Sequence, residues 1–140
     1  MEVVTAKEAG VKKVFICSPF SPRGKTENEI LEDMSRNIET AQKACRYAAL
    51  KGMIPLAPHL YFTQFLHDTD ETERGYGQML GLTWLAQCSE LWVIGNRISS
   101  GMKKEIEKAM EWDIPIRHFA WKQDLEDVLT EMLKELFELD

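Results

Sequence analysis

Short apolar runs alternate with longer amphipathic segments along this chain of 140 residues. Four runs rich in β-branched, aromatic and other apolar residues predict strands over residues 14–18 (VFICS), 53–57 (MIPLA), 91–95 (LWVIG) and 114–119 (IPIRHF). The longer segments predict helices over about residues 26–51, 72–87, 102–112 and 125–137. This alternation is typical of a parallel sheet covered by helices. We therefore predict a single α/β domain over residues 1–140, a doubly wound, flavodoxin- or Rossmann-like parallel sheet of four to five strands with helices on both faces.

The first predicted helix carries signals at both ends. Thr26 and Glu29 have the spacing of a capping box, and Gly52 is well placed to terminate the helix. Ahead of the second helix, residues 61–71 contain turn formers and acids without a clean period, and we expect a long loop there.

Three glycines fall within the second predicted helix, at Gly75, Gly77 and Gly81. Each costs about 1 kcal/mol relative to alanine in a helix interior. Close packing or the approach of a ligand therefore explains them better than helix propensity does.

Most residues with candidate chemistry follow the first three strands. SPFSPRG follows the first strand, PHLYF the second and GNRISSGMKKE the third. In parallel α/β sheets, ligands bind beyond the carboxyl ends of the strands. We therefore expect these segments to line a nucleotide-sized pocket.

The third of these segments combines a helix start with an acid. Ser99, Ser100 and Gly101 precede a predicted helix, whose free N–H groups and dipole favour a phosphate or a carboxylate. Glu105 lies one turn further, where its carboxylate could face a ligand held there. The alternative is that the serines only cap the helix and Glu105 is a solvated charge beside two lysines. The spacing alone favours this alternative, because serine caps are common.

Two other residues near the predicted pocket have alternative interpretations. His59 follows a strand, where it could stack on a base or donate to a phosphate, or it could be a structural loop histidine. Arg23 could pair with a phosphate, although an exposed loop arginine is the default expectation.

Cysteines and histidines give no sign of a metal centre. The three cysteines are widely spaced in apolar stretches, which favours buried reduced thiols over a disulfide or zinc framework; they are Cys17, Cys45 and Cys88. The three histidines have no metal-ligand spacing. We expect neither a metal nor an organic cofactor.

The formal charge of −6 limits the kinds of binding partner that we expect. It argues against a broad contact with a nucleic-acid polymer or an anionic membrane, because both need a surplus of Lys and Arg on one face. The chain also lacks a signal-peptide-like N-terminus and any run of 18 apolar residues. We expect a cytoplasmic protein with a small-molecule ligand.

These motifs together resemble those of the nucleoside 2-deoxyribosyltransferase-like superfamily. The resemblance rests on VFICSPF, a helix carrying Asn37 and Ala41, PLAPHLYF, LWVIG and SSGMKKEIEKA, and it covers about residues 13–119. The sequence is most similar to an uncharacterised branch found in bacterial and phage genomes.

The resemblance implies an enzyme that acts on a nucleoside or a nucleoside monophosphate. Glu105 would be the nucleophile at the anomeric carbon, because an anion stabilises an oxocarbenium-like transition state. The implied ligand-binding residues are Ser18, Pro19, Arg23, Asn37, His59, Ser99, Ser100, Gly101 and Met102. The resemblance also implies a homodimer or a higher homo-oligomer.

The sequence departs from the characterised hydrolases of this group at two positions. Phe15 stands where they have an aromatic hydroxyl, and Gly81 where they have an acid. The acids available to replace the missing one are Asp68, Asp70, Glu71 and Glu73. The first hypothesis is an N-glycosidic hydrolase or deoxyribosyltransferase. The alternative is an inactive nucleotide-binding module that senses or sequesters its ligand, and a weaker third is a structural subunit.

Overall fold

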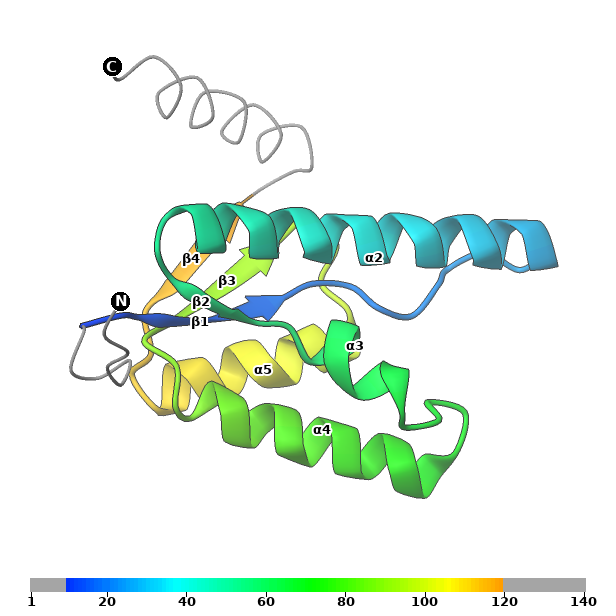
Figure 1. The fold of residues 1–140 in the computed structure, drawn as a ribbon. Helices are drawn as coiled ribbons and strands as arrows, with labels where there is room; N and C mark the ends of the chain where they lie inside the picture. The colour runs from blue at the N-terminus through cyan, green and yellow to red at the C-terminus, as the bar shows by residue number, and fades with distance from the viewer. Residues whose placement is uncertain (1–9, 120–140) are drawn as a thin grey trace, which may run out of the picture.

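The computed structural model of this chain describes residues 10–119 (Figure 1). Four parallel strands form one sheet in these residues, in the order β2-β1-β3-β4. The strands are β1 (Lys13–Cys17), β2 (Ile54–Leu56), β3 (Glu90–Ile94) and β4 (Ile116–Phe119). The helices are α2 (Glu27–Leu50), α3 (Pro58–Tyr61), α4 (Glu71–Leu85) and α5 (Ser100–Glu111), with a 3₁₀ turn η1 (Phe62–Gln64) after α3. The predicted parallel α/β fold is confirmed.

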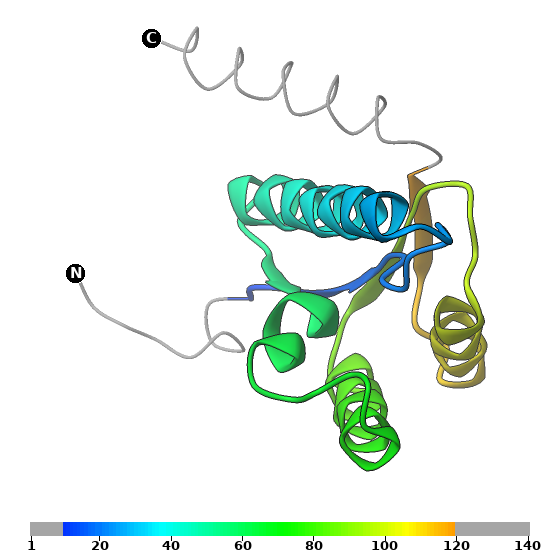
Figure 2. The ribbon, with the colours of Figure 1, turned by 90° about the vertical axis from the view of Figure 1, so that its right-hand side faces the viewer.

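Helices lie on both faces of the sheet. Figure 2 shows α2 on one face and α3, α4 and α5 on the other. Between residues 10 and 119, no helix has the length and apolarity needed to cross a bilayer.

Strand side chains alternate between two apolar cores, as the two-residue period of a strand requires. Val14 and Ile16 of β1 pack with α2, whereas Phe15 and Cys17 pack toward α4 and α5. The first core also contains Ala44, Tyr47, Ala48, Ala57, Trp92 and Ile94. The second also contains Leu85, Cys88, Leu91, Val93, Met102 and Ala109. Burial on both faces explains why the two central strands, β1 and β3, are continuous apolar runs in the sequence.

Helix α2 begins and ends close to its predicted limits. The Thr26 side chain caps it by accepting from the backbone N–H of Glu29, with Oγ1 and N 3.2 Å apart. The Glu29 carboxylate accepts from the backbone N–H of Lys25 and not from that of Thr26, so the predicted capping box is shifted by one residue. After the helix, Gly52 has φ +80°, a left-handed conformation that favours glycine.

The segment after β2 differs from its prediction. Residues 58–64 are helical where we expected the long loop to begin, because Pro58 occupies the first turn of α3 and has the φ value of a helix. The other strand and helix limits lie within about two residues of their predictions. The helix predicted over residues 125–137 lies outside the described residues.

The connections from β1 and from β3 run to opposite edges of the sheet, since β2 lies beside β1 and β4 beside β3. From β1 the chain continues into α2 on one face, and from β3 into α5 on the other (Figures 1 and 2). The loops that leave these neighbouring strands therefore separate and open a crevice at their carboxyl ends.

Candidate functional site

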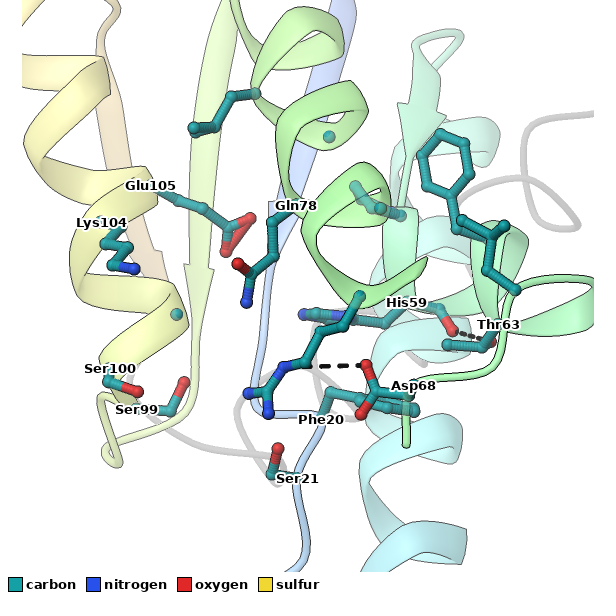
Figure 3. A pocket seen from close by; sticks show the side chains of 18 of the residues that line it. Phe20, Ser21, His59, Thr63, Asp68, Gln78, Ser99, Ser100, Lys104 and Glu105 are labelled. Atoms are coloured by element: carbon teal, nitrogen blue, oxygen red, sulfur yellow. Dashed lines mark hydrogen bonds and ion pairs between the residues drawn. The ribbon is translucent and has the colours of Figure 1, made fainter. Parts of the chain in front are cut away.

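A pocket of about 170 Å³ lies at the carboxyl edge of the sheet (Figure 3). Its walls come from the loop after β1, from α3 and η1, from α4 with the segment before it, and from the start of α5. The pocket is lined by Phe20, Ser21, Pro58, His59, Phe62, Thr63, Leu66, Asp68, Glu73, Arg74, Gly77, Gln78, Gly81, Leu82, Ser99, Ser100, Gly101, Lys104 and Glu105.

The α5 wall begins with a capped helix N-terminus. The Ser99 hydroxyl oxygen accepts from the backbone N–H of Met102 at 3.3 Å, and the Met102 sulfur accepts from the backbone N–H of Ser99 at 3.5 Å. Met102 itself is buried in the core, which anchors this turn. Ser100 and Gly101 are left facing the pocket at the positive end of the helix dipole.

Glu105 lies one turn further along α5 and lines the pocket. Burial raises the pKa of this carboxyl from 4.5 to about 7, because a charge is poorly solvated there. The thiol of Cys17, at the end of β1, donates to Glu105 Oε1 at 3.6 Å and acts in the opposite direction, lowering the pKa. In Figure 3 the Glu105 side chain extends toward Gln78 of α4. Glu105 is therefore not the solvated surface charge of the alternative interpretation.

His59 and Phe20 form the facing wall. Their rings are stacked, with centroids 5.0 Å apart and planes 11° from parallel. The Thr63 hydroxyl donates to the backbone oxygen of His59 at 2.5 Å. Burial lowers the pKa of His59 and so favours the neutral ring, although the charge of Asp68 opposes this. A neutral ring stack offers an apolar surface to a planar ligand.

Helix α4 contributes both glycines and larger side chains to the pocket wall. Gly77 and Gly81 lie one turn apart, and both line the pocket. A Cβ atom added at Gly77 would contact only Leu66 and Phe62, and one at Gly81 only Pro58. The same wall carries charges from Arg74 and Glu73.

The four acids that could replace the acid absent at Gly81 have different positions in the structure. Asp68 and Glu73 line the pocket, whereas Asp70 caps α4 by accepting from the backbone N–H groups of Thr72 and Glu73. Asp68 lies 4.0 Å from Arg74. Glu71 is exposed in the first turn of α4 and does not line the pocket.

The structure brings together five of the ten residues that the sequence indicated, namely His59, Ser99, Ser100, Gly101 and Glu105. The other five, Ser18, Pro19, Arg23, Asn37 and Met102, do not line the pocket. Ser18 is fully buried after β1, and Arg23 is exposed with its backbone N–H bound to Asp33.

Asn37 holds the first loop without reaching the pocket. Its side-chain amide donates to the backbone oxygen of Phe20 at 3.0 Å, and the Arg97 guanidinium donates to the backbone oxygen of Ser21 at 3.2 Å. The two hydrogen bonds fix the loop segment that presents Phe20 and Ser21 to the pocket.

Several lining residues were not singled out from the sequence: Phe20, Ser21, Phe62, Thr63, Leu66, Gln78 and Lys104. Of these, Phe20, Ser21, Phe62 and Lys104 lie in segments that were expected to line the pocket. The sequence signal that pointed toward this wall was the presence of glycines, among them Gly77 and Gly81, inside a predicted helix. Phe20 and Ser21 lie within the first predicted segment, but nothing in that segment distinguishes them from their neighbours.

Metal-binding groups do not converge in the part of the chain that the structure describes. Within residues 10–119, no group of three His, Cys, Asp or Glu side chains could hold a metal ion. The three cysteines are free thiols, with Cys17 and Cys88 buried and Cys45 half-buried.

Comparison with known proteins places this site in a family and a fold. A family model described as "Domain of unknown function (DUF7768)" matches residues 12–119. The structure is similar to that of a 2-deoxyribosyltransferase from the psychrotolerant bacterium Bacillus psychrosaccharolyticus, with a TM-score of 0.59 and 15% sequence identity, over 77% of this chain and 72% of that chain. No curated protein matches this chain. At this identity the structural similarity shows the fold alone.

Proposed function

We propose, from the premise that this chain belongs to the DUF7768 family of unknown function, that it cleaves or transfers the N-glycosidic bond of a nucleoside or nucleoside monophosphate. One observation carries the proposal: the half-buried Glu105 carboxylate lines a pocket one turn beyond the N-terminus of α5. The fold shared with a 2-deoxyribosyltransferase supports the same substrate class.

Glu105 would act as the nucleophile. Its ionised carboxylate attacks the anomeric carbon, a glycosyl ester forms, and the bond to the base nitrogen breaks with its electron pair leaving on the base. Water or a second base then attacks the ester and releases Glu105. With a pKa of about 7, a substantial fraction of Glu105 is ionised near neutral pH.

The departing base needs a proton. Asp68 and Glu73 are the two candidate acids that line the pocket. Asp68 lies 4.0 Å from Arg74, and the Glu73 carboxylate accepts from the backbone N–H of His67 at 3.2 Å. Either acid could supply the proton. General acid help of this kind is typically worth about 10²–10⁴-fold in rate.

The start of α5 would hold the 5′ end of the ligand. Ser99, Ser100 and Gly101 present hydroxyl and backbone groups at the positive end of the helix dipole, and Lys104 adds a charge beside them. The stacked rings of Phe20 and His59 would flank the base. Because the 5′ end would lie at the positive end of a helix dipole, the site favours a nucleoside 5′-monophosphate over the free nucleoside.

The direct test is base release from deoxynucleosides, ribonucleosides and their 5′-monophosphates, followed by chromatography. We expect Glu105→Gln to reduce release at least 100-fold. Glu107→Gln is the matched control, because Glu107 is exposed on the same helix. Release that persists in Glu105→Gln would exclude this nucleophile.

A nucleotide-binding module without turnover is the second candidate. Phe15 is fully buried and has no hydroxyl, and Gly81 has no side chain to donate a proton. Such a module would retain its ligand without releasing base. A ligand at 100 times its Kd would stabilise the fold by about 2.7 kcal/mol in either case, so base release distinguishes the two candidates.

A further inference from the structure

The thiol of Cys17 contacts the carboxylate of Glu105, the candidate nucleophile. Cys17 is the last residue of β1, its side chain is fully buried, and it belongs to the core formed with α4 and α5. Its Sγ lies 3.6 Å from Glu105 Oε1 and 3.8 Å from the backbone oxygen of Met102. A thiol has one hydrogen, so it donates to one of these two oxygens at a time.

No other side chain holds the Glu105 carboxylate by a hydrogen bond or ion pair within residues 10–119. The charged and titratable groups around it are those of the pocket walls: Lys104 on its own helix, His59 on α3, and Asp68, Glu73 and Arg74 on α4 and the segment before it. A glutamate side chain has three rotatable bonds, and a single donor anchored on a strand restricts where its carboxylate can go.

We propose that Cys17 is a positioning residue for Glu105, its thiol holding Oε1 at the pocket wall. The catalytic consequence rests on the proposed function, whereas the contact and its effect on ionisation do not.

The charge of Glu105 decides which acceptor the thiol uses. A carboxylate is a stronger acceptor than a backbone carbonyl, so the thiol turns to Glu105 when the acid ionises. When Glu105 is neutral, the Met102 oxygen competes for the same hydrogen. Burial raises the pKa of the Cys17 thiol, and the neighbouring Glu105 charge raises it further, so the thiol keeps its proton throughout.

The first test titrates Glu105 in the ligand-free protein by its infrared carboxyl band, identified by its loss in Glu105→Gln. We expect Cys17→Ala to move the midpoint to higher pH by about half a unit or more, because the donor to the ionised form is gone. Cys17→Ser keeps a donor and should leave the midpoint at or below that of the wild type.

The matched control is Cys88→Ala. Cys88 is a buried thiol of the same core, but it donates to the backbone oxygen of Trp84 and does not contact Glu105. Its removal should leave the midpoint unchanged. An unchanged midpoint in Cys17→Ala, or an equal shift in Cys88→Ala, would overturn the proposal.

A second measurement follows the Cys17 thiol in the wild-type chain, and variants serve only to assign the band and as a control. The infrared S–H stretching band of Cys17, assigned by its loss in Cys17→Ser, should move to lower frequency as Glu105 ionises and should stay fixed in Glu105→Gln. An S–H band whose frequency does not change when Glu105 ionises would contradict the contact.

Activity gives an independent readout. If the protein releases base, the rising limb of its pH profile should move to higher pH in Cys17→Ala and return in Cys17→Ser. If the wild type releases no base with any nucleotide, the proposed function fails, but the two infrared titrations still decide the role of Cys17.

Discussion

The imidazole ring of His59 lies flat against the phenyl ring of Phe20, with centroids 5.0 Å apart. The two residues follow different strands, β2 and β1, so the stack joins α3 to the loop after β1 at one wall of the pocket. Offset stacked rings contribute about 0.5–1.5 kcal/mol beyond the area that they bury.

Phe20→Ala should weaken nucleotide binding about 3- to 10-fold, because the His59 ring loses its support and the wall loses apolar surface. Isothermal titration calorimetry measures the change. Phe65→Ala is the control, since Phe65 is 54% exposed and does not line the pocket. Equal affinity in both variants would mean that the stack is not part of the binding surface.

Asn37→Ala should lower both stability and ligand affinity. The variant loses the hydrogen bond to the backbone oxygen of Phe20, which contributes about 1 kcal/mol, and the first loop is no longer fixed at that point. Thermal unfolding with and without a nucleoside monophosphate measures both effects. The exposed Asn28, on the same helix, provides the matched control, and Asn28→Ala should match the wild type.

Stability should fall with rising pH through the titration of Glu105. In the unfolded chain this carboxyl ionises near 4.5, whereas in the folded protein it ionises near 7. The contribution of the Glu105 carboxyl to the free energy of unfolding is therefore fully present below pH 4.5 and is lost as the pH rises through 7.

Glu105→Gln lacks this loss, so its stability relative to the wild type should increase between pH 4.5 and 8 by about 3 kcal/mol. The difference between the two melting temperatures across this range isolates Glu105 from the other titrating groups. A difference that is constant with pH would show that the Glu105 pKa is not raised.

Ser99→Ala should destabilise α5 by about 1 kcal/mol, because the backbone N–H of Met102 loses its capping acceptor. Ser100→Ala should leave the melting temperature unchanged, since Ser100 is exposed and does not cap the helix. Chemical denaturation of the two variants makes the comparison. If both serines bind the ligand as proposed, both variants should bind a nucleoside monophosphate more weakly than the wild type.

Gly77→Leu should abolish ligand binding without unfolding the protein. A side chain there extends from the pocket wall, and its Cβ would lie 3.6 Å from Leu66, an ordinary contact. Gly75→Leu is the control, because nothing lies within 4 Å of an added Cβ and Gly75 does not line the pocket. Both variants should gain helix propensity, about 1 kcal/mol at most. Thermal shift with added nucleotide separates loss of binding from loss of stability.

Much of the fold could be predicted from the sequence because the signals are local. Buried strands such as residues 91–95 are continuous apolar runs, and the spacing of apolar positions identifies a helix such as α2. Thr26 and Gly52 marked its ends. The helix start at Ser99 and the acid one turn later were visible because they depend only on sequence distance. That spacing alone favoured a solvated Glu105, and only the family resemblance implied a role for it.

The site as a whole depended on the tertiary structure. The Phe20–His59 stack and the Cys17–Glu105 contact each join residues more than 35 positions apart. Their distances follow from how loops and helices pack over the sheet, and no periodic pattern in the sequence predicts them. The raised pKa of Glu105 has the same origin, because its desolvation comes from neighbouring elements of the fold.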